Sequence, residues 1–190
     1  MRLTGGSAGG RAVRGPADDA IRPTSDRVRQ ALFNILGPVE GLAVLDLFAG
    51  TGLLGLEALS REAAGAVFVD QSRRAVQLIR RNLDDLDFAR RGEIWPIAAE
   101  AALAKAVREE RRFDLVFADP PYAGENERIL GEFDAWRAIL AEDARVAWEC
   151  AARRPAEIPA SGWEIVDERR YGDTLLFLLR LTRNAGEGSR

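Results

Sequence analysis

The sequence predicts an α/β fold with a mostly parallel sheet, helices on both faces and an antiparallel hairpin at the C-terminal end. Three observations predict it. Short apolar segments alternate with segments of helical spacing from residue 42 onward. The apolar segments are hydrophobic throughout rather than at alternate positions, which is typical of parallel strands covered on both sides. The last two apolar segments flank Gly172 and Asp173, a pair that favours a tight hairpin turn.

The chain ahead of residue 42 is expected to form a short hairpin and one helix. Residues 1–15 contain a turn rich in glycine and serine, which predicts the hairpin. Residues 22–37 carry apolar side chains at helical spacing, with Thr24 or Ser25 as the N-cap and Gly37 where the helix stops. This amphipathic helix precedes the main fold.

From residue 42 onward, strands and helices alternate. Strands are expected at residues 42–48, 65–70, 92–98, 113–119, 144–151, 162–172 and 174–181. Helices are expected at residues 52–61, 73–86, 100–110 and 126–140. The length fits a single domain, which we place at residues 1–183, with the hairpin and helix at 1–38, the core at 39–183 and a loose tail at 184–190.

Composition excludes several kinds of chemistry. The 190 residues include no histidine and one cysteine, Cys150, so imidazole catalysis, an internal disulfide and a cysteine metal cluster are excluded. No metal is expected. Because no apolar run is long enough to cross a membrane and the first residues lack an export signal, the sequence predicts a cytoplasmic protein.

Charge is distributed unevenly along the chain. The formal net charge is −3, but residues 1–30 hold six arginines against three aspartates. A basic segment of this kind can contact nucleic acid phosphates, and it can equally be a solvated surface. The candidate phosphate contacts are Arg2, Arg11, Arg14, Arg22 and Arg27.

A glycine-rich segment follows the first expected strand. Gly50, Gly52 and Gly55 have the spacing G-x-G-x-x-G, which lets the turn tighten and lets backbone amides approach a ligand. Asp70 ends the next strand, 20 residues after Gly50, where a carboxylate can accept hydrogen bonds from ribose hydroxyls. The pattern predicts a nucleoside site, and the alternative is a structural turn beside a solvated acid.

Asp46 narrows the choice of nucleoside. It lies four residues before Gly50, and its charge would repel the pyrophosphate of a nicotinamide cofactor. The same charge suits a cofactor with cationic groups, as S-adenosylmethionine has in its ammonium and sulfonium. Alternatively Asp46 caps amides of the loop itself, and the two roles are compatible.

A rigid polar corner, Asp119-Pro120-Pro121-Tyr122, follows the fourth expected strand. In an open parallel sheet it should face the same crevice as the glycine loop. The prolines remove two amide donors and leave carbonyl acceptors. Asp119 and the Pro120 carbonyl can therefore hold the amino hydrogens of a nucleobase while Tyr122 stacks on the ring. The alternative is a stiffened loop in which Asp119 caps a turn and Tyr122 is buried.

These motifs together resemble the amino-methyltransferases, and one family in particular. Residues 2–11, 21–36, 45–66, 118–122 and 169–179 are similar to the bacterial small-subunit ribosomal RNA guanine-N2 methyltransferases, the RsmD family. The most specific part is residues 22–34, which generic methyltransferases lack. The resemblance implies a seven-stranded, Rossmann-like class I methyltransferase fold and S-adenosylmethionine as methyl donor. It also implies that the acceptor is N2 of a guanine in 16S RNA, presented in an assembled or partly assembled 30S particle.

The resemblance also implies the site residues. Asp119, Pro120, Pro121 and Tyr122 would hold the guanine. The cofactor would lie against Asp46, Phe48, Ala49, Gly50, Thr51, Gly52, Asp70, Gln71, Ala99 and Glu100. One departure is visible at Ala98, where the family has an acid or asparagine that meets the adenine amino group. Glu100 or backbone groups would have to make that contact here.

Three alternatives stay open. A DNA adenine-N6 methyltransferase uses a similar corner, but it normally needs extra length to recognise its target sequence. A nicotinamide oxidoreductase matches the glycine spacing alone. A non-enzymatic RNA-binding module would explain the arginines, which either contact phosphates or pack on the fold, but it leaves the proline corner without a role.

Overall fold

A computed structural model describes residues 1–15, 26–120 and 128–182. The strands are β1 Ala43–Leu47, β2 Gly65–Val69, β3 Gly92–Trp95, β4 Phe113–Ala118, β5 Leu140–Ala151, β6 Trp163–Tyr171 and β7 Thr174–Leu181. The helices are α1 Asp26–Leu36, α2 Leu53–Ser60, α3 Arg73–Asp85, α4 Ala99–Arg108 and α6 Phe133–Ile139. Within these described ranges, no helix has the length and apolar character needed to cross a membrane.

The seven strands form one sheet in the order β3-β2-β1-β4-β5-β7-β6. Neighbours from β3 to β5 run parallel, whereas β7 pairs antiparallel with both β5 and β6. Tyr171 pairs with Thr174, which leaves Gly172 and Asp173 as the two turn residues. Gly172 has φ 61°, a conformation that favours glycine. The predicted mixed sheet with a C-terminal hairpin is therefore confirmed.

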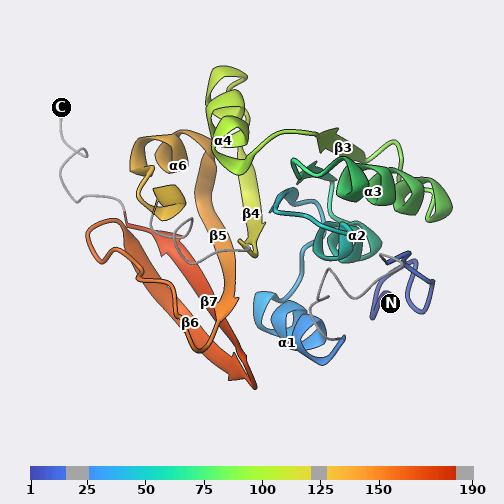
Figure 1. Cartoon of the computed structure of the whole chain (residues 1–190), viewed down its shortest axis with the longest axis horizontal. Coiled ribbons are helices and arrows are strands. Elements are labelled where there is room, and N and C mark those ends of the chain that lie inside the picture. Colours follow the sequence, from blue (N-terminus) through green and yellow to red (C-terminus); the bar gives the residue numbers. More distant parts are fainter. Residues whose placement is uncertain (16–25, 121–127, 183–190) are drawn as a thin grey trace.

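Helices cover both faces of the sheet (Figure 1). One apolar core lies between the sheet and α4 and α6, and the other lies between the sheet and α1, α2 and α3. Successive residues of β4 alternate between these cores, with Val116 in the first and Phe117 in the second. Continuous apolar strands are thus buried on both sides, as the sequence predicts.

One predicted helix differs in the structure. We expect a helix over residues 126–140; within the described residues 128–140, the helical ones are 128–130 and α6, and Gly131 lies in a turn between them. Residues 121–127 lie outside the described part of the chain. The helix also leads directly into β5, because Leu140 is already extended. The strand consequently begins four residues earlier than residue 144, its predicted start.

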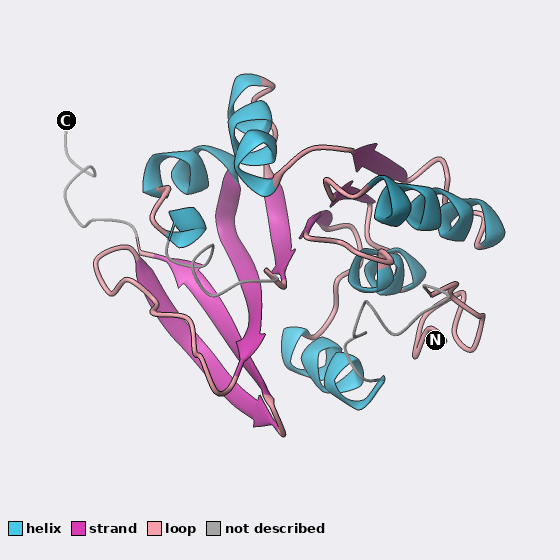
Figure 2. Cartoon of the chain, viewed as in Figure 1, coloured by secondary structure: helices cyan, strands magenta, loops and turns pink. Residues whose placement is uncertain are grey.

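The N-terminal segment forms a single antiparallel bridge between Arg2 and Ala12 rather than two strands. It lies against α2 and α3 (Figure 2) and buries Leu3 and Val13 in the second core. The expected caps Thr24 and Ser25 are outside the described residues. The helix that they precede is present as α1.

A buried ion pair joins α1 to the rest of the fold. The Arg29 Nε of α1 lies 3.2 Å from Glu57 Oε2 of α2, and both side chains are fully buried. Glu57 Oε1 accepts hydrogen bonds from Arg61 Nε at 2.9 Å and from Thr4 Oγ1 at 2.7 Å. One carboxylate therefore connects the N-terminal segment, α1 and α2.

We expect Glu57→Ala to lower the free energy of unfolding by about 3 to 5 kcal/mol, because it leaves the buried Arg29 guanidinium with the exposed Asp26 carboxylate, at 3.0 Å, as its remaining charge partner among the described residues. Urea unfolding measures the effect. Glu62→Ala is the control, because Glu62 is exposed and lies 3.7 Å from Arg91. That change should cost no more than about 0.5 kcal/mol. Equal losses in the two variants would contradict this role of Glu57.

Candidate functional site

The glycine turn after β1 depends on left-handed backbone conformations. Phe48, Gly50 and Gly52 have φ of 59°, 56° and 78°. The Gly52 amide donates to the Ala49 carbonyl at 2.7 Å, which closes the turn immediately before α2. The two glycines adopt these angles without the strain that a side chain would add. The predicted tight turn between strand and helix is present.

Gly55 lets α2 lie close to the sheet. A Cβ at this position would be 2.4 Å from Phe68 Cε1, so a larger residue would force α2 away from β2. The Gly55 amide donates to Asp46 Oδ2 at 2.9 Å. Asp46 is buried, and this burial, together with the charge of Asp70, raises its pKa to about 7 despite the hydrogen bond from Gly55. Asp46 therefore caps an amide of the helix, which is one of its two predicted roles.

Asp70 connects the glycine turn to the end of β2 through hydrogen bonds. Its Oδ2 accepts from the Gly50 amide at 2.9 Å and its Oδ1 from the Ser72 amide at 2.8 Å. Each carboxylate oxygen has a second lone pair, so both can accept another hydrogen bond. Gln71 is exposed beside it. The carboxylate thus has the capacity that a ribose contact requires.

Asp119 emerges beside the glycine turn. Leu47 at the end of β1 pairs with Ala118 at the end of β4, so Phe48 and Asp119 leave the sheet as neighbours. Asp119 is exposed to solvent at the end of β4, but protein atoms around its carboxyl group still displace part of its hydration. This loss of hydration, followed by the charges of Glu149 and Asp46, raises its pKa to about 8. Pro120 is buried.

The other half of the predicted corner, Pro121 and Tyr122, lies outside the described residues. The roles given to these two residues therefore stay predictions. For Asp119 and Pro120, the structure brings the corner to the same edge of the sheet as Gly50, Asp46 and Asp70.

A carboxylate that our sequence interpretation missed also lies at this edge. Glu149 is in β5, the residue is 9% exposed, and its charge acts on Asp119. In the sequence it interrupts an apolar run between Trp148 and Cys150. An acid within a strand that is buried on both faces is unusual, and this was the feature that could have revealed it.

The predicted adenine side lies at the start of α4. Ala98 is the N-cap of that helix and provides no side-chain hydrogen bond, and Ala99 is buried. The Glu100 carboxylate forms an ion pair with Arg128. Thr51 is buried on the opposite side of the turn, where its carbonyl accepts from Asn82 Nδ2 at 3.0 Å. An adenine contact by Glu100 would have to share the carboxylate with Arg128.

Two of the N-terminal arginines contact the C-terminal end of α3. Arg11 donates to the Leu86 carbonyl at 3.3 Å, and Arg14 forms an ion pair with Asp85. Cations at this end of a helix stabilise its exposed carbonyls. Packing on the fold therefore accounts for these two side chains.

The remaining arginines differ in their surroundings. Arg2 donates to the Gly10 carbonyl at 2.7 Å, and Arg27 is exposed on α1. Arg22 lies outside the described residues. A contact between any of the five arginines and RNA stays a prediction.

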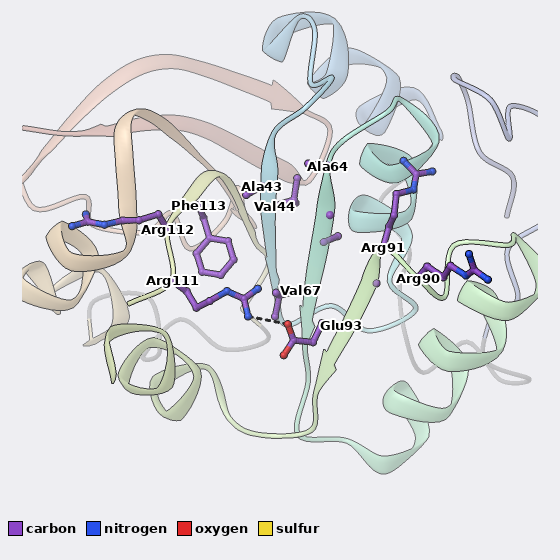
Figure 3. A pocket seen from close by; sticks show the side chains of 13 residues that line it. Ala43, Val44, Ala64, Val67, Arg90, Arg91, Glu93, Arg111, Arg112 and Phe113 are labelled. Atoms are coloured by element: carbon purple, nitrogen blue, oxygen red, sulfur yellow. Dashed lines mark hydrogen bonds and ion pairs between the residues drawn. The ribbon is translucent and has the colours of Figure 1, made fainter. Parts of the chain in front are cut away.

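A separate hollow of about 300 Å³ lies at the opposite edge of the sheet, where the parallel strands begin (Figure 3). Its lining includes Arg90, Arg91, Arg111 and Arg112. These arginines are largely engaged with their own chain: Arg111 lies 2.9 Å from Glu93, and Arg112 donates to main-chain carbonyls of α6 and β5. The hollow is thus distinct from the edge that carries the glycine turn.

Comparison with known proteins places the chain in a family. Residues 1–180 match the family described as Conserved hypothetical protein 95. The chain belongs to this family. Ribosomal RNA small subunit methyltransferase D of Escherichia coli is 34% identical over 90% of this chain and 85% of its own length. The protein of that name from Haemophilus influenzae is 33% identical over 90% and 89%. The resemblance to the RsmD family is confirmed.

Solved structures agree with the family match. The Escherichia coli protein yhhF superposes with a TM-score of 0.81 at 33% identity, covering 94% of this chain and 96% of that chain. A ribosomal protein L11 methylase of Lactobacillus delbrueckii superposes with a TM-score of 0.68 at 18% identity, covering 83% and 79%. The second likeness shows the fold alone. The fold of the chain is that of the class I methyltransferases, as the sequence predicts.

The raised pKa values of Asp46 and Asp119 predict how stability depends on pH. Both groups hold their proton to higher pH in the folded chain than in the unfolded chain, where the pKa is near 4. Unfolding at neutral pH therefore releases protons, and raising the pH favours unfolding. We expect the free energy of unfolding to fall between about pH 5 and pH 8, as urea titrations at several pH values would show.

Variants of Asp46 and Asp119 test whether these two groups cause the pH dependence of stability. Asp46→Asn and Asp119→Asn remove the titrating groups, so each should flatten the curve. Glu93→Gln is the control, because the pKa of Glu93 is lowered and its titration lies below this range. Curves that stay parallel in all variants would contradict the assignment.

Proposed function

We propose that the protein transfers a methyl group from S-adenosylmethionine to N2 of a guanine in small-subunit ribosomal RNA. The observation that carries the proposal is the pairing of β1 with β4, which sets the Asp119-Pro120 corner beside the glycine turn. A nucleoside pocket and a set of acceptors for an amino group thus share one edge of the sheet. Such an edge is where open α/β sheets bind their ligands.

The residues present fit the methyl donor. Gly50 and Gly52 leave the turn without side chains where a nucleoside approaches, and Asp70 is held at the position that suits ribose hydroxyls. Burial is the main cause of the raised pKa values of Asp46 and Asp119, and the neighbouring charges that add to it belong to other acids. A ligand with positive charge relieves this repulsion and favours the ionised carboxylates. S-adenosylmethionine carries such charge and, when bound, supplies an electrophilic methyl group.

The corner supplies what the acceptor base needs. A purine amino group is a weak nucleophile because its lone pair is delocalised into the ring. Asp119 and the Pro120 carbonyl can accept its two hydrogens, which orients the nitrogen toward the donor. The nitrogen becomes acidic once it carries the new methyl group. Asp119, once ionised beside the cationic donor, can take up that proton, and solvent is the alternative acceptor.

The nature of the substrate is inferred from the relatives. The E. coli and H. influenzae proteins are named as methyltransferases of the ribosomal small subunit RNA, and they align with this chain over most of its length. Transfer to ribosomal RNA is therefore the activity that the family membership supports. The guanine N2 position and an assembled or partly assembled 30S particle are the finer parts of the proposal.

Location of the transferred label tests the proposal. The protein is incubated with S-adenosylmethionine labelled in its methyl group and, separately, with unmodified small subunits, free small-subunit RNA and duplex DNA. Nucleosides from each reaction are then separated by chromatography and identified by mass. We expect N2-methylguanosine from the small subunits. Label in N6-methyladenine, or in DNA only, would refute the guanine assignment.

Replacement of Asp119 should separate catalysis from cofactor binding. We expect Asp119→Ala to lower the turnover number by about 100-fold or more, because one acceptor for the amino group is lost. Affinity for S-adenosylmethionine, measured by isothermal titration calorimetry, should change far less. Asp143→Ala is the control, because Asp143 is exposed at the start of β5. Parallel loss of binding and turnover would mean that Asp119 is structural.

Arg27 is the N-terminal arginine best placed to test a phosphate contact, because it is exposed on α1. We expect Arg27→Gln to weaken RNA binding and to reduce the slope of log affinity against log salt by about one. Filter binding of small-subunit RNA at several salt concentrations measures that slope. Arg137→Gln on α6, across the sheet, should leave it unchanged. An unaltered slope in both variants would remove Arg27 from the RNA interface.

A further inference from the structure

Glu149 occupies a position that the proposed function does not yet use. Ala118 of β4 pairs with Trp148 of β5, so the next residues, Asp119 and Glu149, lie side by side where β4 ends. On its other side, Glu149 pairs with Leu176 of β7. Its charge is the second-largest influence on the Asp119 carboxyl group. Two carboxylates from adjacent strands therefore meet at the acceptor corner.

This arrangement is unfavourable for stability. Glu149 is 9% exposed and lies in a strand whose neighbouring side chains are apolar. The charge of Glu149 disfavours ionisation of the neighbouring Asp119. A glutamine or an apolar residue would avoid the repulsion. A ligand that needs two acceptors next to each other gives the arrangement a use.

Guanine is such a ligand. Its Watson–Crick edge presents the N2 amino group directly beside the N1–H group, so two donor groups are adjacent. Adenine presents its N6 amino group beside N1, which carries a lone pair and no hydrogen. A second carboxylate therefore attracts guanine through N1–H and repels adenine. The proposed corner of Asp119 and Pro120 accepts from an amino group and does not by itself distinguish the two bases.

We infer that Glu149 is a specificity residue that accepts a hydrogen bond from N1–H of the target guanine while Asp119 and Pro120 hold its N2 amino group. The inference rests on the proposed function and extends it to the choice of base. A carboxylate has two oxygens and about four acceptor positions, so contacts of Glu149 within the chain leave capacity for the base. Sites that hydrogen-bond a substrate group discriminate strongly against analogues that lack it.

The test uses a base that separates the two donor groups. The target guanosine, once located by the labelling experiment, is replaced by 2-aminopurine riboside in a reconstituted small subunit or an active RNA fragment. This base keeps the 2-amino group, but its N1 has a lone pair instead of a hydrogen. We expect the wild-type protein to methylate it at least about 100-fold more slowly than guanosine.

Variants of Glu149 link this preference to the residue. Glu149→Gln should lower kcat/KM for guanosine by about 100-fold and should reduce the preference over 2-aminopurine, because the glutamine amide can donate to the N1 lone pair. Glu149→Asp keeps an acceptor and should retain part of the preference. Glu164→Gln is the control, since Glu164 is exposed on β6. Affinity for S-adenosylmethionine should stay within about twofold in all variants.

Several results would overturn the inference. One is equal methylation of guanosine and 2-aminopurine by the wild-type protein, which needs no variant and so does not depend on how Glu149→Gln folds. Another is an unchanged preference in Glu149→Gln. A third is parallel loss of cofactor affinity and thermal stability, which would make Glu149 structural. Failure of the wild-type protein to methylate guanosine at all would instead refute the proposed function.

Discussion

The parallel pairing of β1 with β2 on one side and with β4 on the other fixes the position of the candidate site. Leu47 pairs with both Val69 and Ala118, so the residues that follow these three positions leave the sheet at one edge. They are the glycine turn, Asp70 and Asp119. A shift of β4 by one residue would turn each of its side chains to the opposite face of the sheet, so that residues of one core would point into the other. Burial of both faces therefore holds the register that assembles the site.

The same edge concentrates negative charge. Asp46 and Asp119 lie close enough for the charge of one to raise the pKa of the other, and Glu149 adds to the effect on Asp119. Repulsion among these acids reduces the stability of the folded chain. The buried Arg29 and Glu57 side chains, away from this edge, carry opposite charges and attract each other. Functional sites commonly hold groups in unfavourable surroundings that the rest of the fold compensates. This group of acids favours two kinds of ligand: a cationic nucleoside, and a base with two adjacent donor groups.

The sequence predicted the fold because each strand and helix has a local pattern. Apolar runs gave the strands, and the turn at Gly172 could be located from two residues. The prediction of one continuous helix over residues 126–140 was wrong, because Gly131 separates residues 128–130 from α6. The apolar residues on both sides of Gly131 concealed the break. The N-terminal hairpin is reduced to one bridge because packing of Leu3 and Val13 on the core, rather than strand pairing, holds the segment.

Part of the site was predictable because its residues lie at the ends of strands that have a local sequence pattern. Asp46, the glycine turn, Asp70 and Asp119 each end or follow a strand, and a parallel sheet brings such positions together. Glu149 stands out in its own segment as an acid within an apolar run, but a role could not be assigned to it there, because that role depends on the strand beside β5. The pairing of Arg11 and Arg14 with the end of α3 is likewise a contact between distant segments. The structure shows these contacts within the chain, and a contact of the same arginines with RNA stays a prediction.

Crystals of the protein with S-adenosylhomocysteine would show most directly whether the donor pocket and the acceptor corner form one site. The position of the ligand sulfur relative to the Asp119 carboxylate and the Pro120 carbonyl is the quantity to measure. We expect the sulfur to lie at the shared end of β1 and β4, facing these oxygens across a space that fits a flat purine. A sulfur at another edge of the sheet, or one separated from Asp119 by protein atoms, would contradict it.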